Sequence, residues 1–128
     1  MTEKQKRRLA SAGWKFGSTA EFLGLTPDEA ELVEIKLALS RTLRRCREAL
    51  RLSQQQLAKV LGSSQSRVAK MEAADPSVTV DLLLHALVSL GVHRDALGRV
   101  IGVQRVEDTE RVSIRPRLPS GARKALRA

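Results

Sequence analysis

The chain has 128 residues and a formal net charge of +9, with 42% hydrophobic but only 2% aromatic residues. This length suits one compact domain of about 100 residues with extended ends. Because aromatic residues are scarce, we expect a core of Leu, Val, Ile and Ala, which is typical of small packed helices. One Cys and two separated His exclude an internal disulfide and a clustered zinc site, so we expect no metal and no cofactor.

The composition also excludes some classes of function and favours another. No apolar run approaches the roughly 18 residues that a membrane-spanning helix needs, and the first ten residues precede no hydrophobic stretch, so we expect a cytoplasmic protein. Nothing in the sequence assembles a nucleophile, a base or a phosphate-binding glycine loop, and we expect no enzyme. The excess of positive charge instead favours a polyanionic partner such as nucleic acid.

The charges are segregated along the chain. Residues 21–34 contain five acids, with no Lys or Arg between Glu21 and Glu34. Residues 41–51 contain five Arg, and residues 111–128 contain six basic residues and no acid. This pattern predicts that one surface faces an anion while another does not.

The first predicted helix follows a polar arm of residues 1–25, which we expect to be flexible. Thr26 is a suitable N-cap, Pro27 suits the first helical position and Glu29 completes a capping box. Apolar residues at spacings of three and four then predict a helix that ends near Arg51. They are Leu32, Ile35, Leu39, Leu43, Cys46 and Leu50.

Two short helices come next. Ser53 and Gln56 form a capping box for a helix of about eight residues, which Gly62 closes. Ser64 caps a third helix, which ends before Asp75-Pro76. The predicted inward residues of the two helices are Leu57, Ala58, Leu61, Val68 and Met71, and the outward ones are Gln65, Ser66, Arg67 and Lys70.

Two further helices are predicted at residues 80–90 and 94–101, each followed by a Gly. Residues 26–102 would thus form one all-α, five-helix domain. Residues 103–128 are predicted to be a basic tail with little to bury. Within it, Val112 and Ile114, together with Val103, could belong to short extended segments near a dimer contact.

Three residues in or between the predicted second and third helices indicate that these helices cross closely. Ala58 is small, Gly62 permits a sharp turn and Val68 fixes the later helix to the core. The segment 53–73 is therefore predicted to be a helix-turn-helix, whose second helix enters the major groove of DNA.

The predicted DNA contacts follow from that geometry. Gln65, Ser66 and Arg67 begin the second helix of the motif and would contact base edges. Gln54 begins the preceding helix, where it would hold a phosphate and brace the base-contacting helix. Further phosphate contacts are predicted for Arg51, Lys59, Ser64 and Lys70. The alternative is that these residues are ordinary solvated helix positions.

The stretch LSQQQLAKVLGSSQSRVAKME at residues 52–72 resembles the Cro/C1-type helix-turn-helix family, also called the xenobiotic-response-element family. The similarity continues through DPSV at residues 75–78 and covers about residues 41–92. Residues 14–17, 21–26 and 32–39 look like the N-terminal part of antitoxin-type members. This resemblance implies a toxin partner that cleaves messenger RNA and repression of the pair's own operon. The tail from Arg105 onward has no counterpart in the family pattern.

These observations predict a homodimeric repressor that binds a double-stranded DNA operator. A dimer is expected because one small module buries too little surface for strong specificity, whereas two modules combine their contacts. We expect the contact between the two copies of the dimer to lie at residues 94–101 and beyond. The alternative is an antitoxin that neutralises a toxin directly, with DNA binding as autoregulation.

Overall fold

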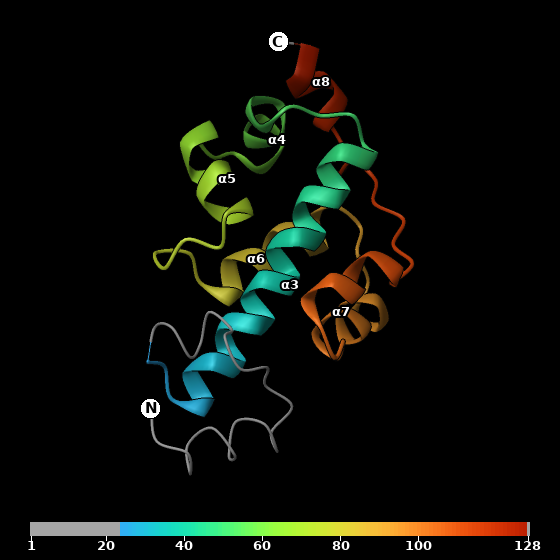
Figure 1. Cartoon of the computed structure of the whole chain (residues 1–128). Helices are drawn as coiled ribbons and strands as arrows, with labels where there is room; N and C mark the ends of the chain where they lie inside the picture. Colours follow the sequence, from blue (N-terminus) through green and yellow to red (C-terminus); the bar gives the residue numbers. More distant parts are fainter. Residues whose placement is uncertain (1–23, 128) are drawn as a thin grey trace. The chain divides into compact units, whose positions relative to one another are not determined.

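The computed structural model describes residues 24–127. Their regular structure is entirely helical, as predicted: six α-helices and one 3₁₀ helix, with no strand between residues 24 and 127 (Figure 1). The elements are α3 (Pro27–Ala49), α4 (Gln54–Leu61), α5 (Gln65–Glu72), α6 (Val80–Ser89), α7 (Arg94–Ile101), the 3₁₀ helix η1 (Val106–Arg111) and α8 (Ala122–Arg127). No helix in this part of the chain is long and apolar enough to cross a membrane.

The chain divides into two compact units, Met1–Ile35 and Lys36–Ala128, and α3 contributes residues to both. In the first unit, the Oγ1 atom of Thr26 accepts a hydrogen bond from the Glu29 amide at 3.2 Å. This cap confirms the predicted helix start at Pro27. Most of the predicted arm, residues 1–23, lies outside the described residues.

The predicted apolar stripe of α3 is wrong at Leu32. Its exposed fraction is 58%, whereas Ala30, which the stripe omits, is buried. Spacing assigns a residue to one face of a helix, but it does not show whether another element covers that turn. Further along α3, Leu39, Leu43 and Cys46 are fully buried, as predicted.

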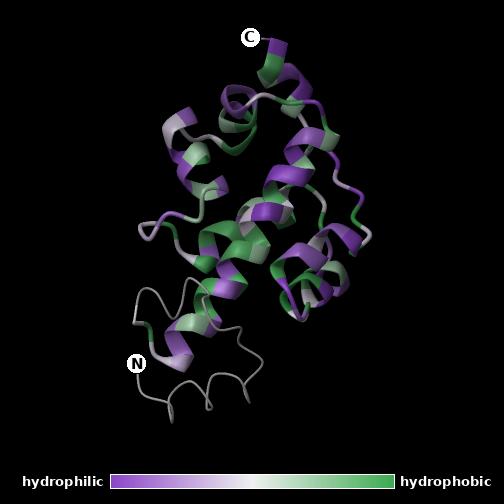
Figure 2. Cartoon of the chain, in the orientation of Figure 1, coloured by the Kyte–Doolittle hydropathy of each residue, from purple (hydrophilic) through white to green (hydrophobic). Residues whose placement is uncertain are grey.

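The core of the second unit consists of aliphatic side chains from successive helices. Figure 2 shows that α6 is hydrophobic along most of its length. The largest fully buried apolar side chains of this unit are Leu39, Leu43, Leu57, Val68, Met71, Leu83, Leu87, Leu90 and Val100. Burial raises the pKa of the Cys46 thiol to about 11, so this thiol stays protonated and unreactive at neutral pH.

The segment after Gly102 buries more than predicted. It forms η1 and α8, which were not predicted, and Thr109, Val112 and Ala122 are buried. Val103, Val112 and Ile114 lie outside both helices, and the backbone of Val112 is extended. The Arg45 guanidinium donates hydrogen bonds to the main-chain oxygens of Thr109 and Val112. Farther on, the Arg117 amide donates to the Leu90 oxygen at 2.7 Å. The two residues in each of these hydrogen bonds lie far apart in the sequence, so local periodicity does not predict the bonds.

The turn between α4 and α5 depends on the conformation of Gly62. Its φ angle is +65°, in the left-handed region, and the following Ser63 amide donates to the Ala58 oxygen at 2.8 Å. A Cβ atom at residue 62 would meet no atom within 4 Å. Only backbone conformation, rather than a steric clash, therefore requires glycine here.

We expect Gly62→Ala to lower the free energy of unfolding by about 1 kcal/mol, because the left-handed conformation is unfavourable for a residue with a Cβ atom. Gly62→Asn is the control and should lose less, since Asn adopts this conformation more readily. Urea denaturation measures both values. Equal stability of the wild type and the Ala variant would show that the turn does not require glycine.

Candidate nucleic-acid interface

Helices α4 and α5 form a compact pair joined by residues 62–64. The Gln56 amide donates to the Ser53 Oγ atom at 3.0 Å, and the Ser53 amide donates to the Gln56 side chain at 2.9 Å. This capping box starts α4 at the predicted residue. Ala58 of α4 and Val68 of α5 are both buried, so two small aliphatic side chains lie in the core of the second unit.

The first turn of α5 presents the three predicted base-contacting residues together. The Ser64 hydroxyl accepts a hydrogen bond from the Arg67 amide at 3.1 Å and thereby caps the helix. Gln65, Ser66 and Arg67 are all exposed. The cap satisfies one amide at the helix start, and the side chains beside it remain accessible to a ligand.

Four of the five predicted phosphate contacts are also exposed: Arg51, Lys59, Ser64 and Lys70. Gln54 differs because it is half-buried and both ends of its side-chain amide are engaged. Its Oε1 atom accepts from the Gln65 Nε2 atom at 2.9 Å, and its Nε2 atom donates to the Glu72 Oε1 atom at 3.3 Å. The Gln54 side chain therefore links the start of α5 to its end.

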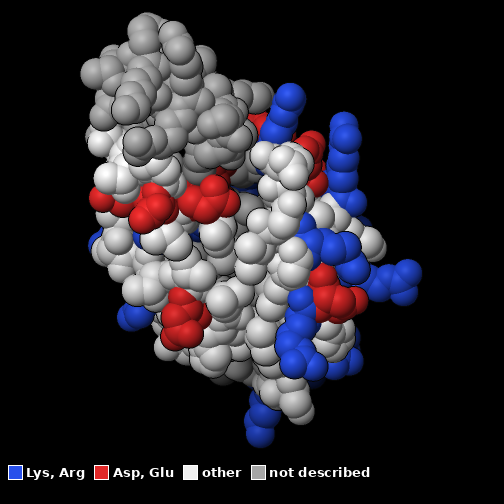
Figure 3. All heavy atoms as spheres, turned by 90° about the horizontal axis from the view of Figure 1, so that it is seen from below, with Lys and Arg blue, Asp and Glu red and all other residues white. Residues whose placement is uncertain are grey.

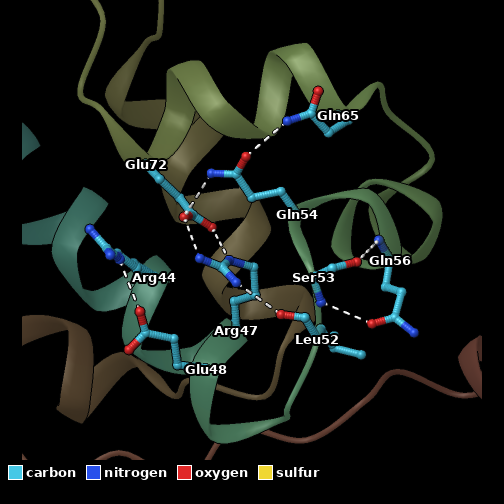
Figure 4. Close-up of polar contacts among 9 residues, drawn as sticks. All are labelled: Arg44, Arg47, Glu48, Leu52, Ser53, Gln54, Gln56, Gln65 and Glu72. Atoms are coloured by element: carbon cyan, nitrogen blue, oxygen red, sulfur yellow. Dashed lines mark hydrogen bonds and ion pairs between the residues drawn. The ribbon is translucent and has the colours of Figure 1, made fainter.

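A part-buried ion pair supports this link (Figure 4). The Arg47 Nε atom donates to the Glu72 Oε2 atom at 2.6 Å, and the Arg47 Nη2 atom donates to Oε1 at 3.0 Å. Their side chains are only 15% and 4% exposed. Arg47 also donates to the Leu52 main-chain oxygen at 2.9 Å. The hydrogen bond to Glu72 raises the pKa of Arg47 above its usual value.

The polar side chains thus form one connected series, from Arg47 on α3 through Glu72 and Gln54 to Gln65. Arg47 was predicted only as one of the five Arg of residues 41–51, with no role of its own. A signal was present: Glu72 is the single acid between Glu48 and Asp75. Glu72 lies four positions after the core residue Val68 and hence on the same side of the helix. An acid in that place predicts a cation close to it.

Charge also distinguishes this pair of helices. Residues 49–71 contain no Asp or Glu, and the Glu72 carboxylate that follows is neutralised by Arg47. Lys and Arg are not confined to α4 and α5, however, because Figure 3 shows them on the side of the molecule seen from below as well. Within residues 24–127, no three His, Cys, Asp or Glu are grouped so that they could hold a metal.

We expect Glu72→Gln to lower the free energy of unfolding by about 2 kcal/mol, because it leaves the part-buried Arg47 charge without its anionic partner. Glu48→Gln is the matched control. It breaks the Arg44–Glu48 ion pair, whose side chains are 65% and 56% exposed, and such pairs contribute less than about 1 kcal/mol. Chemical denaturation compares the two variants, and similar losses would contradict a special role for the part-buried pair.

Comparison with known proteins agrees with this geometry. Residues 38–100 match the family model described as a helix-turn-helix domain. No curated protein and no solved structure matches the chain. The matched region includes α4, α5 and the polar series that joins them to α3. Residues 38–100 are therefore similar to a helix-turn-helix domain, which supports a role in DNA binding and regulation.

Proposed function

We propose that the protein is a Cro/C1-type repressor that binds operator DNA as a homodimer and represses its own operon. The observation that carries this proposal is the exposed first turn of α5, where Gln65 is held by Gln54. In a helix-turn-helix this turn enters the major groove. We further propose that the protein acts in the cytoplasm and has no catalytic activity.

The hydrogen bond to Gln54 is compatible with base contact by Gln65. The Nε2 atom has two hydrogens, of which Gln54 takes one. The second hydrogen and the Oε1 atom suffice for a bidentate pair with adenine. Because Gln54 fixes the amide beforehand, less side-chain freedom is lost on binding. Ser66 and Arg67 lie beside Gln65 and would contact neighbouring bases.

The exposed residues around this turn suit the DNA backbone. We assign phosphate contacts to Arg51, Lys59, Ser64 and Lys70, with Gln54 near a phosphate at the start of α4. Residue 54 begins a helix whose free amides favour an anion. Such contacts position the protein on the duplex without selecting a sequence.

The proposed dimer would use α7 and the residues that follow it. Ile101 of α7 and Val88 of α6 are exposed large hydrophobic residues, which supports a contact with a second copy. A two-fold dimer contacts two half-sites about 34 Å apart, so the operator should be an inverted repeat.

Loss of a base contact and loss of a phosphate contact should have different effects on DNA binding. Gln65→Ala should relax the preference at one base position by about 1 to 3 kcal/mol. Lys70→Ala should weaken binding to all sequences about equally and lower the slope of log affinity against log salt by about 0.9. Footprinting on the protein's own upstream DNA, followed by titrations with single-base variants, measures both effects. Unchanged base preference in Gln65→Ala would reject its assigned role.

The alternative function, an antitoxin, is supported by one observation in the first unit. Leu32 is exposed on α3, and the acids Asp28, Glu29 and Glu31 on the same turns are exposed too. An apolar residue among acids suits a basic protein partner. Residues 14–17 and 21–23 of the antitoxin-like sequence lie outside the described residues.

Co-expression with the neighbouring reading frame tests this alternative. If the protein is an antitoxin, the two products should copurify, and the growth arrest caused by the neighbour alone should be relieved. Leu32→Lys should weaken this complex, while DNA binding through α5 should remain. If the neighbouring product is not toxic and does not bind, the antitoxin function is rejected and the repressor function remains.

A further inference from the structure

The C-terminal helix α8 packs on α4, the first helix of the helix-turn-helix. Both helices lie at the same end of the second unit (Figure 1). Ala122 is buried and Leu126 is half-buried, whereas Arg123, Lys124 and Arg127 are exposed. The apolar side of this short helix therefore packs inward, and its three cations face solvent.

Several anchors upstream determine where α8 lies. Arg45 binds the main chain at Thr109 and Val112, and the Arg117 amide bonds to the Leu90 oxygen. The Arg117 side chain then passes close to Gly91, because a Cβ atom there would lie 2.8 Å from the Arg117 Cγ atom. These contacts hold the segment against the helical core at intervals, so α8 is a positioned element rather than a free tail.

The charges on α8 add to those of the neighbouring motif. Residues 111–128, like residues 49–71, contain no Asp or Glu. Within the described part of the chain, no carboxylate lies within ion-pair distance of Arg123, Lys124 or Arg127. α8 therefore adds three exposed cations next to α4, which itself contains no acid. Such a surface repels itself unless a polyanion lies against it.

We propose that α8 is a second DNA-backbone contact, which extends the footprint of the motif to phosphates beside those bound at α4. The inference rests on the proposed DNA-binding function and adds to it a site outside the matched helix-turn-helix domain. Arg123, Lys124 and Arg127 would each contribute a phosphate contact without reading sequence. Because α8 is already packed in place, little of its backbone must be ordered on binding.

The test is the triple variant Arg123→Gln, Lys124→Gln and Arg127→Gln in the full chain. Binding to operator and to unrelated duplex is titrated over a range of salt concentrations. The slope of log affinity against log salt should fall by about 0.9 for each lost contact. Affinity at 0.15 M salt should fall roughly tenfold to hundredfold, with base preference unchanged.

Two controls make the result specific. The double variant Arg41→Gln and Arg44→Gln removes exposed charges from α3, outside the motif and the proposed dimer contact, and its slope should stay near that of the wild type. The double variant Arg123→Lys and Arg127→Lys keeps the charge and should also keep the slope. Thermal unfolding checks that all variants are folded.

The outcomes distinguish the inference from the proposed function. A smaller slope in the α8 variant alone supports a local contact. Equal losses of slope per removed charge in the α8 variant and in the α3 control would overturn the α8 site and leave the helix-turn-helix function intact. If the wild type itself shows no salt-dependent duplex binding, the proposed function and the α8 site are both wrong.

Discussion

The part-buried ion pair between Arg47 and Glu72 is the constraint on which the site depends. An ionised pair with little access to water is stable only when its geometry and remaining hydrogen bonds are nearly complete. Here the pair has two direct bonds, and Arg47 and Glu72 have further partners in the Leu52 oxygen and the Gln54 amide. Each partner belongs to a different segment, so the pair fixes the arrangement of α3, α4 and α5 and hence the direction in which α5 presents its first turn.

Local chemistry explains why so much of this arrangement could be predicted. Capping residues such as Ser53 and Ser64 act within one turn, and a left-handed glycine such as Gly62 acts on the residue itself, so the starts of α4 and α5 were predictable. Contacts between distant residues carry no such signal. Arg47, Arg45 and the anchors of the C-terminal segment were therefore missed, and Leu32 was assigned to a core that does not cover it.

The candidate site, too, could be predicted where it depends on local residues and not where it depends on distant contacts. The residue types on the first turn of α5 indicated base contact, but their mutual support was only partly foreseen. Gln54 was expected to brace the base-contacting helix, and it bonds directly to Gln65. That its other end reaches Glu72 depends on the close approach of α4 and α5, which only a three-dimensional structure provides. The basic end of the chain was likewise noticed for its charge, while its packing on α4 was not.

In the proposed function, the polar series from Arg47 to Gln65 holds the Gln65 amide in place before DNA binds. A double-mutant cycle of Gln54→Ala and Gln65→Ala, measured as operator affinity, tests this claim most directly, because coupling appears only when two residues act together. The account predicts that the double variant loses clearly less than the sum of the two single losses, with a coupling of about 0.5 kcal/mol or more. Strictly additive losses would contradict it, since Gln54 and Gln65 would then contribute independently.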